Sequence, residues 1–262
     1  MKHVHNSITV LGAHGAKSAE GGSSSFYLNA KHVIDAGNLL LPLEEKSVHI
    51  ETIWLTHSHL DHIADIAYIL DNYYEARTKT LKIFALEETI EALQEHFFNN
   101  KIWPDFSKIP LHNAEDMTIT YHHVNIGEEY PLGDGKTVKA FLGDHSVPSI
   151  GYKIKADTSA LLLSADTYSL EHIVQMVKDD ASITSLVLEC SFPIRMGELA
   201  RVSKHLTADY LFEGIKTLEP LNLTLYINHI KPIYSDIIRE EIATLQGKWN
   251  VVILDDGDTI SF

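Results

Sequence analysis

The stretch LTHSHLDH, residues 55–62, decides how this chain is interpreted. It places His57, His59, Asp61 and His62 directly after an apolar run that is typical of a buried strand. Imidazoles and carboxylates are costly to bury without partners, so these side chains cannot all lie in an ordinary core. A lone His-x-His pair would be typical of a solvated loop or a single structural metal. The longer string His-x-His-x-Asp-His predicts a catalytic metal site.

The spacing within this stretch suits two ions. His57 and His59 lie two positions apart, so both side chains can face one ion. Asp61 and His62 follow at the expected start of a helix and can face a second ion. Two neighbouring ions require a bridging anion, and a carboxylate can bind both through its two oxygens. Imidazole and carboxylate ligands without thiolates suit zinc, manganese or iron in a site that keeps positions open for water, which indicates catalysis.

Other candidate ligands also follow predicted strands. His145 comes after VKAFLGD, Asp166 after ALLLSA, and His229 after LTLYIN. In α/β proteins the carboxyl ends of strands deliver loops to one crevice while the sheet holds them rigidly. We therefore expect these three side chains to converge on His57, with Asp166 as the bridging carboxylate.

The periodicity of apolar residues predicts a layered α/β architecture with mixed sheets, because early hairpins give way to alternating strands and helices. Strands are predicted at 7–12, 24–28, 32–35, 50–55, 137–142, 159–164, 185–190, 223–228 and 251–254. Helices are predicted at about 61–76, 86–98, 168–178, 206–217 and 234–246. We expect a single domain over 1–262, with a helical, aromatic-rich insertion at about 71–113.

Composition narrows the range of partners. The formal net charge is -15 and no basic block occurs, which argues against duplex nucleic acid and anionic membranes as partners. The apolar runs are too short and interrupted to span a bilayer, and the N-terminal residues do not resemble a signal peptide. Cys190 is the only cysteine, which favours a reducing compartment, the cytoplasm. The oligomeric state stays open, with a homodimer as one option.

The segment GAHGAKS, residues 12–18, superficially resembles a phosphate-binding P-loop. That loop requires Gly-Lys-Ser/Thr in direct succession, and here Ala16 separates Gly15 from Lys17. We therefore predict a tight glycine turn near the metal site instead.

The His-x-His-x-Asp-His string resembles the signature of the metallo-β-lactamase superfamily, and VLGAHGAKSAEGGSSSFYLN and VIDAG are similar to its N-terminal strands. The resemblance implies an αββα sandwich with two mixed β-sheets and a hydrolytic site with two divalent metal ions, zinc being favoured over manganese or iron. It also implies a division of the ligands into one ion held by His57, His59 and His145, a second held by Asp61, His62 and His229, and Asp166 bridging them.

Three further segments, LECSFPIRMGELARVSKHLTADYL, LYINHIKP and HFFNNKIWPDF, resemble class II 3',5'-cyclic-nucleotide phosphodiesterases. This resemblance implies hydrolysis of cAMP or cGMP to a nucleoside 5'-monophosphate. His205 would contact the substrate and protonate the departing sugar 3'-oxygen, with Glu189 orienting the imidazole. The candidates that would stack on a purine base are four aromatic residues of the aromatic-rich segment: Trp103, Phe106, Tyr73 and Tyr74.

Two alternatives remain. The tRNA 3'-processing endonucleases share a strand-borne glutamate followed by a His-hydroxyl pair, here Glu189, His205 and Thr207. Their basic tRNA-binding arm has no counterpart in this acidic sequence, which counts against that activity, and another phosphodiesterase on the same metal core is also open. A metal-binding protein without catalysis is the alternative from another class, but an intact ligand set with both Glu189 and His205 argues against a degenerate site.

Overall fold

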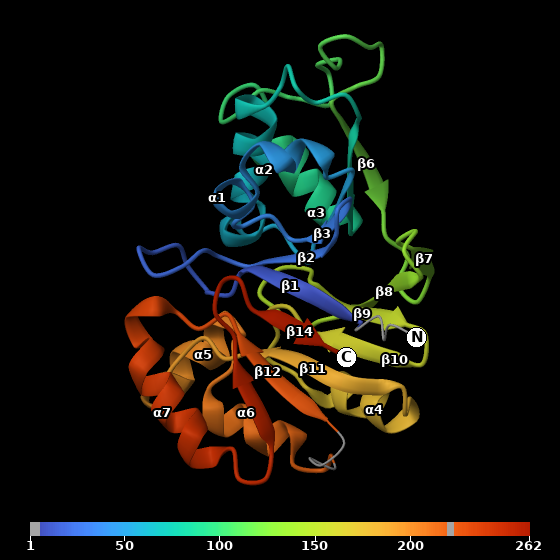
Figure 1. Ribbon diagram of the computed structural model, residues 1–262. Coiled ribbons are helices and arrows are strands. Elements are labelled where there is room, and N and C mark those ends of the chain that lie inside the picture. Colours follow the sequence, from blue (N-terminus) through green and yellow to red (C-terminus); the bar gives the residue numbers. More distant parts are fainter. Residues whose placement is uncertain (1–5, 219–222) are drawn as a thin grey trace.

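The computed structural model describes residues 6–218 and 223–262 as two seven-stranded sheets packed face to face (Figure 1). The first sheet has the order β14-β1-β2-β3-β4-β5-β6, and its strands are β1 (Ser7–Gly12), β2 (Ser25–Asn29), β3 (His32–Ile34), β4 (Thr52–Trp54), β5 (Leu81–Ala85), β6 (Ile119–His123) and β14 (Thr259–Ser261). The second has the order β13-β12-β11-β10-β9-β8-β7, and its strands are β7 (Glu129–Pro131), β8 (Lys136–Leu142), β9 (Ile150–Ala156), β10 (Ser159–Leu163), β11 (Ile183–Glu189), β12 (Thr224–Asn228) and β13 (Asn250–Ile253).

Both sheets are mixed in the same way. In the first, β14, β1, β2 and β3 pair antiparallel, and β3 to β6 pair parallel. In the second, β7 to β10 pair antiparallel, and β10 to β13 pair parallel. The carboxyl ends of the parallel strands therefore lie along one edge of each sheet, which is where loops that carry ligands are expected.

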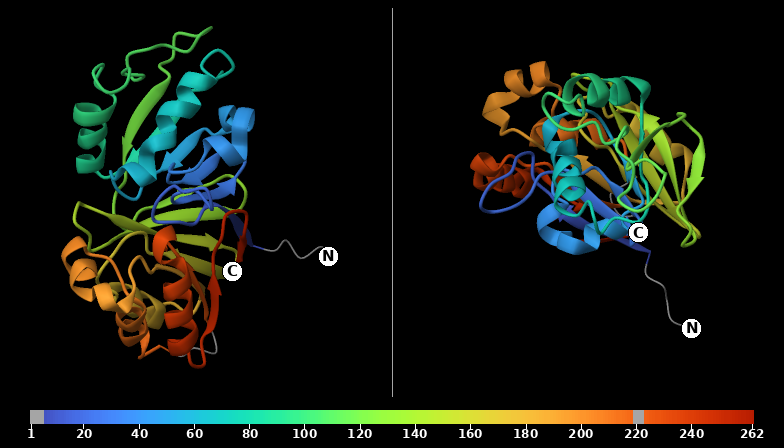
Figure 2. Two further views of the ribbon diagram at one scale, coloured as in Figure 1. Left: turned by 90° about the vertical axis from the view of Figure 1, so that its left-hand side faces the viewer. Right: turned by 90° about the horizontal axis from the view of Figure 1, so that it is seen from above.

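Helices cover the outer face of each sheet (Figure 2). Over the first sheet lie α1 (Leu40–Leu43), the short helix η1 (Glu44–His49), α2 (Leu60–Asn72), α3 (Glu87–Ala92) and η2 (Leu93–Phe97). Over the second lie α4 (Glu171–Asp179), η3 (Ile194–Met196), α5 (Gly197–Ser203), α6 (Ala208–Ile215), η5 (Pro232–Tyr234) and α7 (Ser235–Leu245). No helix among the described residues is long and apolar enough to cross a membrane.

Three apolar clusters separate these layers. The central cluster lies between the sheets and joins residues such as Val10 and Phe26 of the first to Tyr152 and Leu161 of the second. The other two lie between each sheet and its own helices. Burial of apolar side chains is the main favourable contribution to folding, so this four-layer αββα arrangement has three separate sources of stability. The fold class predicted from the sequence is confirmed.

The structure contains all nine predicted strands and a helix in each predicted helical range. The sequence analysis missed β5, β6, β7, β9 and β14. The segment 71–113, predicted to be a helical insertion, holds α3 and η2 but also β5, which pairs with β4 and β6 inside the first sheet. The organisation as a single domain with an insertion stays a prediction.

Two hydrogen bonds join the His-rich stretch to the opposite sheet. The Tyr152 hydroxyl of β9 donates to the Leu55 carbonyl at 2.9 Å, and the Ile150 amide donates to the Thr56 carbonyl at 3.0 Å. Because these bonds lie directly before His57, they fix the position at which the chain leaves β4 and enters the loop to α2.

Substitution of Gly37 by alanine tests the close packing behind α2. A Cβ at Gly37 would lie 1.9 Å from the Asp61 carbonyl oxygen, so the first turn of α2 would have to move. We expect Gly37→Ala to lower the free energy of unfolding by about 1–3 kcal/mol in urea titrations. Gly197→Ala is the matched control because a Cβ there meets nothing within 4 Å, and we expect its stability to match the wild type. Equal stabilities of the two variants would contradict this account.

Candidate metal site

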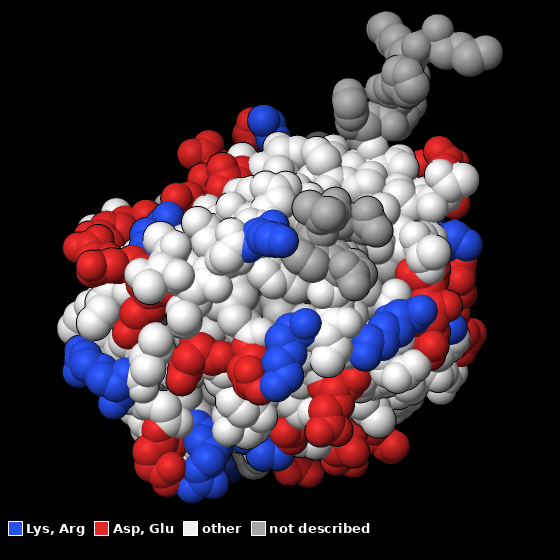
Figure 3. Space-filling view, turned by 90° about the horizontal axis from the view of Figure 1, so that it is seen from below, with Lys and Arg blue, Asp and Glu red and all other residues white. Residues whose placement is uncertain are grey.

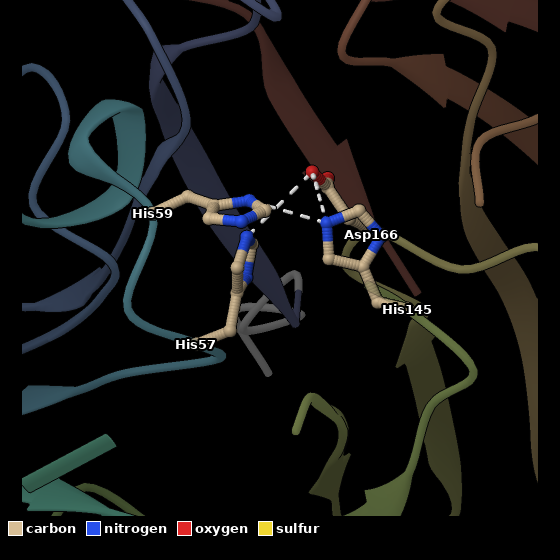
Figure 4. Close-up of side chains that lie close together, drawn as sticks. All are labelled: His57, His59, His145 and Asp166. Carbon is tan, nitrogen blue, oxygen red and sulfur yellow. Dashed lines mark hydrogen bonds and ion pairs between the residues drawn. The ribbon is translucent and has the colours of Figure 1, made fainter. Parts of the chain in front are cut away.

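Four predicted ligands form the first group in the structure. His57 and His59 lie in the loop after β4, His145 follows β8, and Asp166 follows β10 (Figure 4). The Asp166 Oδ2 atom lies 3.8 Å from Nε2 of both His57 and His145. The His145 Nε2 atom lies 3.2 Å from His59 Nδ1. These side chains come from both sheets and point toward one another, as the strand-end argument predicts.

The second group is Asp61, His62 and His229. Asp61 and His62 occupy the first turn of α2, and His229 follows β12. The two imidazole Nε2 atoms lie 3.3 Å apart, and His229 Nε2 lies 3.4 Å from Asp61 Oδ2. Asp166 stands between the groups, because its Oδ1 atom lies 3.3 Å from His229 Nε2, while Oδ2 lies 3.5 Å from His62 Nε2 and 3.8 Å from Nε2 of both His57 and His145.

The donor atoms of this cluster fit a bound cation. The His57 Nε2 atom is buried and has no hydrogen-bond partner, although an unpaired buried nitrogen is energetically costly. Imidazole nitrogens also approach each other at 3.2 Å and 3.3 Å, close enough for one cation to be shared between them. A cation would give the His57 nitrogen its missing partner. The cluster therefore fits a metal site of the kind that histidine and aspartate build.

The electrostatics favour the ligating forms of His57 and Asp166 but not that of His62. Burial acts to lower the pKa of His62, but Asp35 and Asp166 outweigh it and raise that pKa well above its usual value. Burial, followed by the neighbouring His62, lowers the pKa of His57 well below its usual value, so the neutral imidazole that binds metals is maintained. Burial acts to raise the pKa of Asp166, but His229 and His62 outweigh it and hold that pKa well below its usual range. The carboxylate thus stays ionised although it is buried.

Asp35 positions the first turn of α2. Its Oδ2 atom lies 2.7 Å from Nδ1 of His62 and accepts a hydrogen bond from the Thr56 hydroxyl, while Oδ1 accepts from the Thr56 amide at 2.8 Å. With Nδ1 of His62 bonded to a carboxylate, Nε2 is directed to the cluster. Asp35 adopts a left-handed backbone with φ of 56°, a strained conformation that is often found at functional sites.

Two further ligands have outer partners. Nδ1 of His145 donates to the Lys204 carbonyl at 3.0 Å, which leaves Nε2 for the cluster. Nδ1 of His229 lies 2.9 Å from the Ser191 hydroxyl, which donates in turn to Glu189 Oε2 at 2.6 Å. One hydroxyl therefore connects His229 to the carboxylate that holds His205.

His205 and Glu189 form a buried pair beside the metal cluster. Nδ1 of His205 donates to Glu189 Oε1 at 2.9 Å, and the same Oε1 accepts from the Thr167 amide at 3.1 Å. Burial acts to lower the pKa of His205, but the Glu189 carboxylate outweighs it and raises that pKa above the ordinary value. His205 Nδ1 is also 3.9 Å from Asp166 Oδ2, so the pair adjoins the ligands.

The structure does not bring Trp103 into this cluster. Its ring packs edge-on against Tyr68 of α2, with 5.9 Å between ring centroids, and joins the apolar layer outside the first sheet. Tyr68 lies seven residues along α2 from Asp61, a rise of about 10 Å. A substrate contact by Trp103 stays a prediction.

Sequence reasoning missed the outer partners Asp35, Ser191 and the Lys204 carbonyl. Asp35 could have been found, because it ends the apolar run VI in VIDAG and a carboxylate at a strand end needs a partner. Ser191 and the Lys204 carbonyl gave no such signal, since a serine or a backbone oxygen has no characteristic spacing from the ligand it holds.

Charged side chains of both signs are mixed on one side of the molecule (Figure 3). On the face drawn in Figure 3, as far as its described residues go, lysine and arginine side chains are interspersed with aspartate and glutamate and form no continuous basic surface. Binding of duplex nucleic acid requires clustered basic side chains.

The fold and the site together define a metallo-β-lactamase fold protein, since solved proteins of that fold match it over nearly the whole chain. Within this class, the family model of class-II cAMP phosphodiesterases matches residues 29–133. A probable 3',5'-cyclic-nucleotide phosphodiesterase of Yersinia pestis is 23% identical over 252 residues, which cover 81% of this chain and 68% of that protein. The resemblance to class II cyclic-nucleotide phosphodiesterases is confirmed.

Two solved structures show the same fold. Unliganded yeast PDE1 has a TM-score of 0.82 at 19% identity, covering 98% of this chain and 99% of that one. The short form of human tRNase Z has a TM-score of 0.66 at 18% identity, covering 97% and 98%. At these identities the likeness defines the fold, and the substrate has to be argued from the site.

Substitution of Asp35 tests whether the outer partners tune the metal site. Asparagine is nearly isosteric but replaces one acceptor oxygen by a donor, so it cannot accept all three hydrogen bonds from Thr56 and His62. We expect Asp35→Asn to weaken metal affinity by about 10- to 100-fold in chelator competition. Asp105→Asn is the control, because Asp105 is also buried but is bonded to Ser107 and Lys108 away from the cluster. Unchanged affinity in Asp35→Asn would show that Asp35 does not orient His62.

Proposed function

We propose that the chain is a metal-dependent phosphodiesterase that hydrolyses 3',5'-cyclic nucleotides to nucleoside 5'-monophosphates. The observation that carries the proposal is the His205–Glu189 pair, joined at 2.9 Å and placed beside a His/Asp metal cluster. The family match to class-II cAMP phosphodiesterases supports the choice of substrate.

The metal cluster accounts for the attack on phosphorus. We assign one ion to His57, His59 and His145, a second to Asp61, His62 and His229, and the bridging position to Asp166. Bound divalent ions would neutralise phosphate charge and activate a water molecule near neutral pH. The Asp166 carboxylate lies within 3.8 Å of Nε2 atoms from both ligand groups, which suits a bridging role.

His205 accounts for the departure of the leaving group. Its Nδ1 proton is held by Glu189, so proton transfer must use Nε2, and the imidazole must be doubly protonated to donate from there. The Glu189 carboxylate favours that imidazolium form. Donation from Nε2 to the sugar 3'-oxygen lets the phosphorus–oxygen bond break without forming an alkoxide.

Several finer assignments belong to the same proposal. Zinc is the favoured metal because histidine and aspartate without thiolates suit an open zinc site, with manganese or iron as alternatives. The single cysteine supports a cytoplasmic location, and a homodimer stays one option for the assembly. The second candidate function, tRNA 3'-processing endonuclease, is supported by the fold shared with human tRNase Z and by a match to a nuclear ribonuclease Z of Triticum aestivum, 28% identical over 113 residues.

Hydrolysis by metal-loaded protein tests the proposal directly. Cyclic AMP, cyclic GMP, bis(p-nitrophenyl) phosphate and a precursor tRNA would be compared, with bound metal quantified in the same sample and chelator-stripped protein as the control. We expect cyclic nucleotides to yield 5'-monophosphates. Cleavage of the artificial diester or of RNA, without cyclic-nucleotide hydrolysis, would move the natural substrate to another phosphodiester. Full metal loading without any turnover would favour a non-catalytic protein.

Replacement of His205 separates proton donation from metal binding. We expect His205→Ala to keep nearly all of its bound metal while kcat falls by about 10²- to 10⁴-fold, because the leaving oxygen loses its proton donor. His123→Ala on the exposed end of β6 is the control and should match the wild type. His205 also lies within coordination reach of Asp166 and His229, so a collapse of metal content would identify it as a ligand instead.

A further inference from the structure

A pocket of about 370 Å³ opens directly beside the second ligand group. It lies between the glycine turn at 12–18 and the first two turns of α2, and it includes Asp61 in its wall. Its volume is within the range of small-molecule sites. Its other principal lining residues are Gly15, Ala16, Lys17, Leu60 and Ala64.

The exposed lining of this pocket is mostly apolar. Leu60 is 63% exposed although it directly precedes the ligand Asp61, and Ala64 lies one turn further along α2. Ala16 faces the same space from the glycine turn. Aliphatic walls with few polar groups suit a flat ring that is weakly hydrated on its faces, as a nucleobase is.

Lys17 supplies the only cationic group among the residues that line this pocket. Its ammonium lies 2.5 Å from Asp65 Oδ1, and the other oxygen of Asp65 accepts hydrogen bonds from the Leu39 and Leu40 amides at 2.7 Å and 2.8 Å. The carboxylate is therefore held firmly and fixes the ammonium in turn. An ammonium has three N–H donors, so donors remain for a ring nitrogen or carbonyl oxygen of a base.

The glycine turn is rigidly attached to the metal site. Asp256 accepts hydrogen bonds from the Ala13 amide at 2.9 Å and from the Gly22 amide at 2.7 Å, so one carboxylate ties the start of the turn to the chain that follows it. A Cβ at Gly15 would lie 2.6 Å from the His229 carbonyl oxygen, so the turn packs directly against a ligand-bearing loop. The pocket is thus formed before any ligand enters, which lowers the entropic cost of binding.

We propose that this pocket binds the nucleobase of a nucleotide whose phosphate lies at the metal cluster, with Leu60 and Ala64 on one side, Ala16 on the other, and Lys17 donating to the base edge. The inference rests on the proposed function. A larger pocket of about 720 Å³ near Tyr73, Tyr74 and Phe106 is aromatic but lies at the far end of α2. Asp61 and Tyr73 are separated by about 18 Å of helix axis, further than a mononucleotide extends.

Calorimetric titration of metal-loaded protein with AMP, GMP and inorganic phosphate tests the pocket, because phosphate probes the metal cluster alone. Ala64→Leu places a larger side chain in the pocket from the wall formed by α2. We expect it to weaken nucleotide binding by at least about tenfold, while phosphate affinity stays within about twofold of the wild-type value. Ala76→Leu makes the same change in the aromatic pocket and should alter neither affinity. If Ala64→Leu fails to fold, Ala16→Val narrows the pocket from the opposite side with the same expectation.

Three results would overturn the assignment of this pocket: unchanged nucleotide affinity in Ala64→Leu, weaker nucleotide binding in Ala76→Leu instead, or an equal loss for nucleotide and phosphate. The last would mean that the substitution acts through the metal ligands. Binding is measured separately from turnover. If Ala64→Leu weakens nucleotide binding as expected but the wild-type protein hydrolyses no cyclic nucleotide, the proposed function is disproved and the base pocket remains supported.

Discussion

The convergence of imidazole nitrogens on the Asp166 carboxylate is the constraint on which this structure depends. His57, His62, His145 and His229 each place Nε2 within 3.3–3.8 Å of that carboxylate, in a region nearly closed to water. Buried lone pairs and a buried negative charge at such distances are unfavourable unless a cation is shared among them. The outer hydrogen bonds cannot remove this cost, but they decide which nitrogen of each ring faces inward. The buried polar partners of the histidines therefore serve to orient the imidazole rings. The stability that offsets the cost of burying them comes from the three apolar layers.

That orientation is reflected in the backbone. Asp35, Ala165 and His229 all adopt left-handed conformations, with φ of 56°, 55° and 60°, at or next to the cluster. Each such conformation costs of the order of 1–3 kcal/mol and persists only where the surroundings determine it fully. The sandwich provides those surroundings, because residues of β9 hold the end of β4 and the turn of Gly37 packs directly on α2. The two ligand groups described first, His57 with His59, His145 and Asp166, and Asp61 with His62 and His229, each draw residues from both sheets.

Much of this could be predicted from the sequence, because ligands at strand ends leave two signals at once: an apolar run and a polar residue that ends it. His57, His145, Asp166, Glu189 and His229 all follow that pattern, and all meet in the structure. The strands that were missed lack it. β9 contains two lysines and a glycine that interrupt its apolar run, and β5 follows a long helix within a segment rich in aromatics. Their identity is set by pairing with distant strands, which a local pattern does not record.

The metal ligands are largely buried and the pocket beside them is exposed, so substitutions in the two regions should affect substrate choice differently. Metal ligands are fixed by strand ends and by outer partners such as Asp35, so a substitution among them disturbs several bonds at once. Leu60, Ala64 and Ala16, in contrast, contribute side chains to the adjoining pocket without belonging to either ligand group. Changes at these three positions can alter what lies beside the phosphate while the chemistry at the phosphate is retained. The same set of metal ligands could therefore act on different phosphodiesters. The residues that select among these substrates should be sought beside the first turn of α2 and not among the histidines.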